Sequence, residues 1–165
     1  MSLKTTRIVL RVDLTSGEIT RETLAEDFYR LYPGGKALAG YFLLNEMPSG
    51  IDALDPQNLL ILANGLMTGS PVSTTPRYVV AGRSPLTNAV GSSEAGGYWG
   101  PELKKAGYEA VILTGRAEAP VYLWIHDEAV EIRSAAHLWG LTTADVQDII
   151  QEELEDSRIR VLQTG

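Results

Sequence analysis

The chain has 165 residues, a formal net charge of −7 and no cysteine. Its length, with 44% hydrophobic and 21% charged residues, is typical of one folded domain with one hydrophobic core. The acidic balance without a long basic run excludes a nucleic-acid-binding surface and disfavours an acidic membrane partner, and the lack of cysteine excludes disulfides, thiol catalysis and thiolate-held zinc or iron–sulfur sites.

The first part of the chain predicts a hairpin followed by two helices. Residues 7–14 read RIVLRVDL, and residues 18–22 are expected to return as a second strand after a Thr-Ser-Gly turn. The sequence TLAE at 23–26 has the form of a capping box before a first helix. PGG at 33–35 ends that helix, and a second helix is expected over about 36–46.

The middle of the chain predicts two strands and a glycine-rich loop. NLLILAN at 58–64 is short, apolar and bounded by turn residues, as is typical of a buried strand. After a long loop, another strand is expected over 77–82. The glycine-dense stretch that follows includes residues 91–97, which are expected to form a loop.

The last part of the chain predicts a short helix, strands and a longer helix. The short helix covers 102–106, between Pro101 and Gly107. The longer helix begins at Thr143 and carries apolar residues on one face. Strands are expected over 109–115, 121–127, 130–134 and, at the end, 158–165.

Two similar runs of elements indicate an internal repeat. A hairpin, a helix and a buried strand ending in glycine occur over about 7–69 and again over about 121–165. The second copy lacks the loop, the arginine-bearing strand and the glycine-rich turn that follow Gly65. We therefore interpret residues 1–165 as a single α+β domain that is truncated in its second repeat.

No segment has the features of a targeting or membrane-spanning sequence. The first seven residues contain no apolar core of signal-peptide length, and nowhere do 18 apolar residues follow one another. We expect a cytoplasmic protein without a membrane partner.

Two cationic side chains are candidates for binding an anion. Lys36 follows Gly34-Gly35 at the start of a helix, where free N–H groups and the helix dipole attract negative charge. The same glycines also fit a plain turn between helices. The Arg77 guanidinium, after a flexible loop, could grip a phosphate through two parallel hydrogen bonds or simply be solvated.

The glycine-rich loop is the strongest single candidate site. Small residues let a ligand approach the backbone, serine hydroxyls donate hydrogen bonds, and a glutamate can hold a hard cation. A surface loop whose glycines allow positive φ is the alternative. The candidate contacts are Ser93, Glu94, Ala95, Gly96 and Gly97. No residue has the spacing of a catalytic triad or a zinc motif, so no catalytic residue is assigned.

Several stretches, taken in order, resemble the N-terminal domain of aldehyde ferredoxin oxidoreductases over nearly the whole chain. They read LRVDLTSGEI, NLLILANGLMTG, RYVVAGRSPLT and AGGYWGPELKKAGYEAVILTG. The resemblance implies an α+β fold of two intertwined repeats with mixed sheets. In that family, such a domain forms a base for tungsten or molybdenum held by two pterin dithiolene groups, so a domain without cysteine can still seat the metallocofactor.

The resemblance also implies a function and partners. The full enzyme would oxidise aldehydes to carboxylic acids with ferredoxin as electron acceptor. It would contain a Mg²⁺ ion bridging the pterin phosphates and a 4Fe-4S cluster in downstream domains that this sequence does not include. We expect this chain alone to be inactive, to associate with downstream domains or a large subunit, to meet ferredoxin only through the full enzyme, and to form a homo-oligomer.

Carried over residue by residue, the family pattern gives roles to three side chains. Arg77 would contact a pterin phosphate, and the loop with Glu94 would lie beside the magnesium ion, with Glu94 as its ligand. Family members often have asparagine at this position. The helix opening also departs from the family's Arg-Gly-Leu, which weakens the assignment of Lys36 as a cofactor contact.

Two other interpretations stay open at this point. One is a stand-alone, noncatalytic pterin-binding or assembly subunit of the same fold, which the departures at Glu94 and at the helix opening favour. The other is a self-associating remnant that binds no cofactor, because half a repeat leaves sheet edges and apolar surface to cover.

Overall fold

The computed structural model describes residues 7–164, so the predictions that concern residues 1–6 and Gly165 lie outside it. Eight strands and four helices follow one another along these residues. They are β1 (Ile8–Asp13), β2 (Ile19–Thr23), α1 (Glu26–Leu31), α2 (Gly35–Glu46), β3 (Leu60–Asn64), β4 (Tyr78–Arg83), β5 (Val90–Ala95), α3 (Trp99–Lys105), β6 (Ala110–Thr114), β7 (Val121–His126), β8 (Ala129–Ser134) and α4 (Thr143–Glu153).

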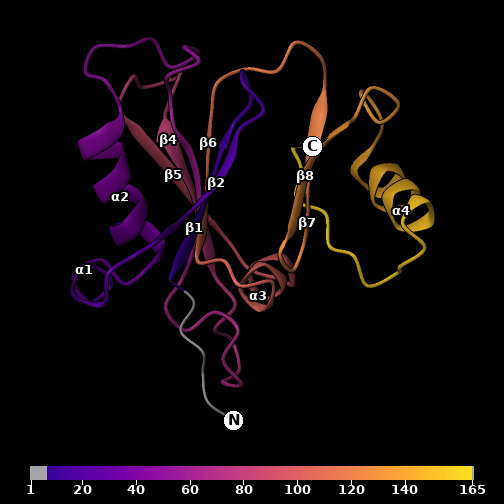
Figure 1. Ribbon diagram of the computed structural model, residues 1–165, viewed down its shortest axis with the longest axis horizontal. Coiled ribbons are helices and arrows are strands. Elements are labelled where there is room, and N and C mark those ends of the chain that lie inside the picture. The colour runs from indigo at the N-terminus through magenta and orange to yellow at the C-terminus, as the bar shows by residue number, and fades with distance from the viewer. Residues whose placement is uncertain (1–6, 165) are drawn as a thin grey trace.

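A mixed six-stranded sheet forms the centre of the molecule (Figure 1). Its strand order is β2-β1-β6-β3-β4-β5. The β1–β6 pair is parallel and the other neighbours are antiparallel. The predicted α+β fold with a mixed sheet is confirmed.

Apolar side chains on both faces of the sheet are covered by different elements. Helices α1 and α2 lie on one side, and α3 and the β7–β8 hairpin on the other (Figure 1). Helix α2 buries Leu38 and Phe42 against the sheet, four residues apart and therefore on one helix face. Full burial of such a side chain contributes roughly 1.5–3 kcal/mol, so this packing holds α2 against the sheet.

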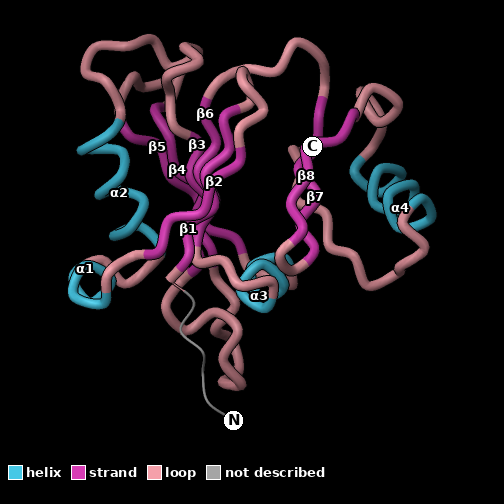
Figure 2. The backbone as a smooth tube through the Cα atoms, viewed as in Figure 1, coloured by secondary structure: helices cyan, strands magenta, loops and turns pink. Residues whose placement is uncertain are grey.

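The hairpin β7–β8 forms a separate two-stranded sheet between the central sheet and α4 (Figure 2). Leu123 and Ile125 of β7 pack toward the central sheet, and Tyr122 packs toward α4. Helix α4 adds Val146 and Ile150 to that outer cluster. Alternating side chains of one strand therefore join two apolar clusters.

Three local predictions are wrong. The capping box predicted at 23–26 does not form, because Thr23 belongs to β2 and pairs with Ile8. The residue before α1 is Ala25, which makes no side-chain capping hydrogen bond. The glycine-rich stretch is not a loop throughout: β5 is an edge strand whose residues are mostly exposed, so it has no apolar alternation to indicate a strand. Residues 158–164 form no strand, because no described strand pairs with them.

Within residues 7–164, no helix is both long and apolar enough to cross a membrane.

Candidate anion-binding site

The start of α2 places Lys36 close to the end of β3. Gly34 and Gly35 have φ of 75° and 53°, which side chains rarely adopt. Gly34 also forms an isolated antiparallel bridge with Gly65, and a Cβ on Gly34 would collide with the carbonyl oxygen of Asn64. The close backbone contact therefore requires glycine, and it fixes the first turn of α2, where Lys36 lies.

The backbone of Arg77 is fixed by the segment that follows β3. The Gly65 N–H donates to the Arg77 carbonyl oxygen at 2.8 Å. The Thr68 hydroxyl donates to the same oxygen at 2.5 Å, and the Arg77 N–H lies 3.2 Å from that hydroxyl oxygen. Gly65 is thus in contact with both Gly34 and Arg77, which brings the start of α2 and the start of β4 together.

The guanidinium of Arg77 lies over the backbone of Gly96. A Cβ built on Gly96 would lie 2.5 Å from the Arg77 Nη1 atom and 3.2 Å from the Pro76 carbonyl oxygen. Any larger residue at position 96 would therefore displace the guanidinium or the backbone. The next residue, Gly97, has a φ of 90° and leads into α3.

Glu94 completes a charged cluster with Lys36 and Arg77. Its Oε1 atom lies 2.7 Å from the Lys36 Nζ atom, and both side chains are about half exposed. The hydrogen bond from Lys36 lowers the pKa of Glu94 most strongly, followed by the charge of Lys36, and the charge of Arg77 lowers it further. Both cations therefore lie near one carboxylate.

The predicted site residues do not all lie on the same side of β5. Arg77, Lys36, Glu94 and Gly96 come together at one place. Ser93 and Ala95 flank Glu94 in the strand, so their side chains point to the opposite face. There Ser93 lines a shallow hollow at the β4–β5 edge.

The cluster has the chemistry of an anion seat. Two cations and one carboxylate leave a net charge of +1 beside a backbone segment without side chains. In residues 7–164, no three His, Cys, Asp or Glu side chains gather to hold a metal ion. Glu94 therefore has too few protein carboxylates around it to form a divalent-cation site from side chains alone.

A buried ion pair beneath the site was not predicted from the sequence. Glu109 is fully buried, and its Oε2 atom lies 3.2 Å from the Nζ atom of Lys104, whose side chain is 10% exposed. Lys104 also donates to the carbonyl oxygens of Gly65 and Leu66 at 3.3 and 3.2 Å. Burial, followed by the negative charge of Glu109, raises the pKa of Tyr29. The pair therefore supports the Gly65 segment, to which both Gly34 and Arg77 are bound.

The sequence holds only a weak signal for this pair. Glu109 directly precedes an apolar strand, and Lys104 lies five residues earlier. A glutamate at a strand end is ordinarily solvated, so its burial depends on the tertiary approach of α3, β1 and α2.

The fold and the cluster define an α+β domain suited to binding an anionic group, and comparison with known proteins gives its family. Residues 9–165 match the family model "Aldehyde ferredoxin oxidoreductase, N-terminal domain". The chain therefore belongs to this family, and the predicted resemblance is confirmed.

Similar proteins share the sequence over almost the whole chain. A tungsten-containing aldehyde ferredoxin oxidoreductase of Pyrococcus abyssi is 43% identical over 157 residues, 95% of this chain and 26% of that protein. The "aliphatic sulfonate oxidoreductase, WOR-like subunit" of Pyrococcus furiosus is 35% identical over 90% of this chain and 24% of that protein. The chain thus spans about a quarter of these relatives.

A solved structure shares the fold. The BamBC active-site complex of benzoyl coenzyme A reductase with 1,5-dienoyl-CoA contains a chain that is 40% identical, with a TM-score of 0.90. The match covers 93% of this chain and 23% of that chain.

Replacing Lys104 tests the support of the Gly65 segment. We expect Lys104→Met to lower the free energy of unfolding by about 3–5 kcal/mol, because it removes the cation that lies 3.2 Å from the buried Glu109 carboxylate. The neighbouring Lys105→Met is a matched control, since Lys105 is exposed and forms a surface ion pair with Glu102. Urea denaturation followed by circular dichroism measures both, and equal effects of the two substitutions would contradict a supporting role for Lys104.

Proposed function

We propose that this chain grips the phosphate groups of a metallopterin cofactor in an oxidoreductase that converts aldehydes to carboxylic acids with ferredoxin as electron acceptor. The family membership and the tungsten-containing relatives support a tungsten–pterin cofactor in the full enzyme. Because the chain spans about a quarter of those relatives, the reaction and the contact with ferredoxin would require further domains or a large subunit.

The contact of Arg77 with the Gly96 backbone carries this proposal. A guanidinium offers several N–H donors in a planar fork that matches two phosphate oxygens. Lys36 adds a second cation. The Glu94 carboxylate pairs with Lys36 and is also influenced by the charge of Arg77. A phosphate between these side chains would face the open backbone at Gly97.

The residues of the site fit the phosphate end of a pterin cofactor. The space beside Gly96 is taken by the Arg77 guanidinium, whereas a Cβ on Gly97 would have nothing within 4 Å, so a ligand could reach the Gly97 backbone. When bound, the metallocofactor supplies the two-electron redox chemistry, and its own sulfur atoms hold the metal. This chain's residues would bind and orient the phosphates and take no direct part in the chemistry.

Glu94 would respond to the charge of the incoming group. Alone, its carboxylate competes with phosphate for Lys36, with which it already pairs at 2.7 Å. With Mg²⁺ present, a carboxylate beside phosphate oxygens becomes a hard-cation ligand, and phosphate oxygens would supply the ligands that the protein lacks there. We therefore propose Glu94 as a magnesium contact only when phosphate is bound.

The names of the relatives differ in substrate: an aldehyde ferredoxin oxidoreductase, an aliphatic sulfonate oxidoreductase and a benzoyl coenzyme A reductase are all similar in sequence to this chain. The shared part is thus more suited to holding a common cofactor than to selecting a substrate. Aldehyde oxidation is our proposal for this chain because the most similar of the relatives described above carries that name.

Substitutions at the guanidinium contact test the phosphate site. We expect Arg77→Ala to weaken inorganic pyrophosphate binding by roughly 10- to 100-fold, since a hydrogen bond to a charged group contributes about 1.5–3 kcal/mol. Gly96→Ala should also weaken binding, because its Cβ displaces the guanidinium. Isothermal titration calorimetry of the 165-residue chain measures both.

Two matched controls accompany these variants. Arg83→Ala removes a guanidinium at the other end of β4, where it bonds Asn88, and Gly40→Ala adds a methyl group where nothing lies within 4 Å. Neither should change pyrophosphate affinity. If Arg83→Ala weakens binding as much as Arg77→Ala, the anion is held by general surface charge and the proposed site is wrong.

Removing the carboxylate of Glu94 tests its competition with phosphate. Without magnesium, Glu94→Gln should bind pyrophosphate a few-fold more tightly than the native chain, because Lys36 is released from its ion pair. With magnesium, the native chain should gain affinity and Glu94→Gln should gain less. An affinity that falls in Glu94→Gln without magnesium would show that the carboxylate does not compete with the anion.

A further inference from the structure

The loop that leads from β3 to Arg77 has one buried residue. This segment extends beyond the end of the central sheet (Figure 1). Among residues 65–77 only Thr68 is buried, at 2% exposure, whereas Leu66 and Met67 are about half exposed. A buried polar side chain in an otherwise exposed loop is expected to have hydrogen-bond partners. Thr68 is therefore the candidate anchor of this loop.

The Thr68 hydroxyl contacts the main chain at the end of the loop. It donates to the Arg77 carbonyl oxygen, accepts from the Arg77 N–H at 3.2 Å, and lies 3.4 Å from the Thr75 carbonyl oxygen. Both main-chain groups of Arg77 also have another partner. Its N–H donates to the Thr75 carbonyl oxygen at 2.8 Å, and its carbonyl oxygen accepts from the Gly65 N–H. Loss of the hydroxyl would therefore loosen the Arg77 backbone without leaving it unpaired.

Helix α3 holds the other side of Thr68. A Cβ on Gly100 would lie 3.3 Å from the Thr68 methyl carbon, so the glycine lets α3 lie directly against this residue. One turn later, Lys104 donates to the carbonyl oxygens of Gly65 and Leu66. Gly100 and Lys104 are four residues apart and so share one helix face. This face of α3 clamps the first residues of the loop.

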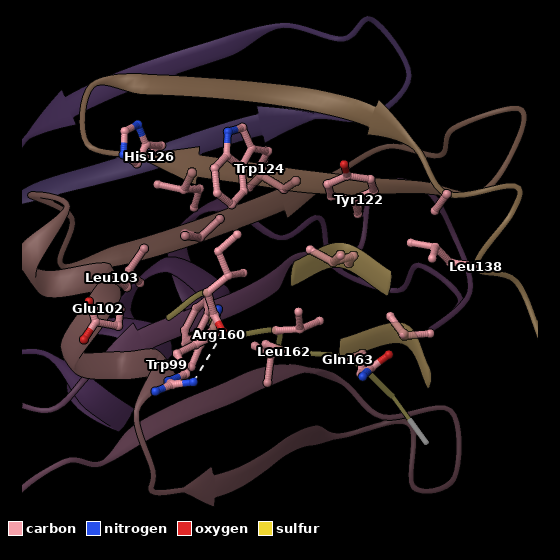
Figure 3. Close-up of a pocket in the computed structure, with 18 of the residues that line it drawn as sticks. Trp99, Glu102, Leu103, Tyr122, Trp124, His126, Leu138, Arg160, Leu162 and Gln163 are labelled. Atoms are coloured by element: carbon pink, nitrogen blue, oxygen red, sulfur yellow. Dashed lines mark hydrogen bonds between the residues drawn. The ribbon is translucent and has the colours of Figure 1, made fainter. Parts of the chain in front are cut away.

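A different face of α3 is held by the hydrophobic core. There Trp99 and Leu103 line a groove of about 1350 Å³ beside β7, and neither Gly100 nor Lys104 lines it (Figure 3). Trp99 and Leu103 also pack in the apolar cluster between the central sheet and the β7–β8 hairpin. Because this packing holds α3 independently of the loop, the helix gives Thr68 a fixed surface.

The direction of the Arg77 guanidinium depends on the backbone that Thr68 contacts. Arg77 is exposed, and its Nη1 atom donates to the Pro76 carbonyl oxygen at 3.4 Å, a long hydrogen bond. On its other side the guanidinium lies against the Gly96 backbone. A side chain with such weak contacts keeps one direction only where its main chain is held by neighbouring residues.

We propose that Thr68 is a positioning residue for Arg77, whose buried hydroxyl fixes the backbone from which the guanidinium reaches a phosphate. This inference rests on the proposed phosphate site and adds a residue that determines its affinity. The two parts of the threonine side chain have separate tasks: the methyl group packs against α3, and the hydroxyl bonds Arg77. Thr68 acts through Arg77 and not by contacting the anion.

Matched substitutions at position 68 separate the hydroxyl from the shape of the side chain. Thr68→Val keeps the branched shape and removes the hydroxyl, so it should weaken binding of inorganic pyrophosphate to the 165-residue chain by roughly three- to tenfold. Thr68→Ser keeps the hydroxyl and should bind as tightly as the native chain. Thr87→Val makes the same change at an exposed position in the β4–β5 turn and should have no effect. Isothermal titration calorimetry measures all three.

A second background shows whether Thr68 acts through Arg77. In the Arg77→Ala chain, adding Thr68→Val should weaken pyrophosphate binding no further, because the guanidinium that Thr68 positions is gone. Equal weakening in both backgrounds means that Thr68 acts on the fold in general, and it overturns the proposal. Thr68→Cys has a similar size but only a weak donor. It should weaken binding less than Thr68→Val, and it takes the place of that variant if the valine chain does not fold.

Nuclear magnetic resonance without any anion separates this inference from the phosphate site itself. The signals of the Arg77 Nε–H group and the Gly96 amide should shift in Thr68→Val but not in Thr68→Ser. If they shift and the native chain binds no pyrophosphate, Thr68 still positions Arg77 and the proposed function is wrong. If neither signal shifts, the positioning role is wrong. It is also wrong if Thr68→Val binds as tightly as the native chain while Arg77→Ala binds weakly, a result that leaves the phosphate site intact.

Discussion

Gly65 joins the two elements that carry the cations of the candidate site. Its backbone bridges to Gly34 at the start of α2, and its N–H bonds the Arg77 carbonyl oxygen at the start of β4. The carbonyl oxygen of the preceding residue, Asn64, leaves no space for a side chain at Gly34. The Asn64 N–H donates to the Glu109 carbonyl oxygen. Four elements, α2, β3, β4 and β6, therefore meet at one backbone junction, supported from below by the Lys104–Glu109 pair.

The location of the site follows from this junction. Lys36 and Arg77 are 41 positions apart in the sequence. Gly65 brings them together, because it bridges to Gly34, two residues before Lys36, and donates a hydrogen bond to Arg77 itself. Edge strand β5 then brings Glu94 and Gly96 to the same place by pairing with β4. The cluster lies at the end of the six-stranded sheet, where the backbone contacts of Gly65 hold the elements that carry the two cations.

Much of the fold could be predicted from the sequence because its strands and helices have buried faces. The run LILAN of β3 and the apolar face of α4 indicate their elements directly. Strand β5 could not be predicted because both its faces are largely exposed, and the apolar pattern of residues 158–164 predicts a strand although no described strand pairs with them. Of the site, the glycines and Arg77 could be named from local chemistry. The Lys36–Glu94 pair and the burial of Glu109 depend on contacts between distant segments, which local pattern does not encode.

The central claim, that Lys36, Arg77 and Gly96 form one anion seat, is tested most directly by nuclear magnetic resonance. Inorganic pyrophosphate is titrated into the isotopically labelled chain, and the signals of the Lys36, Gly96 and Gly97 amides and of the Arg77 Nε–H group are followed. The account predicts that all four shift together and saturate along a single binding curve. Shifts that saturate at different concentrations, or that appear only at residues remote from this cluster, would contradict it.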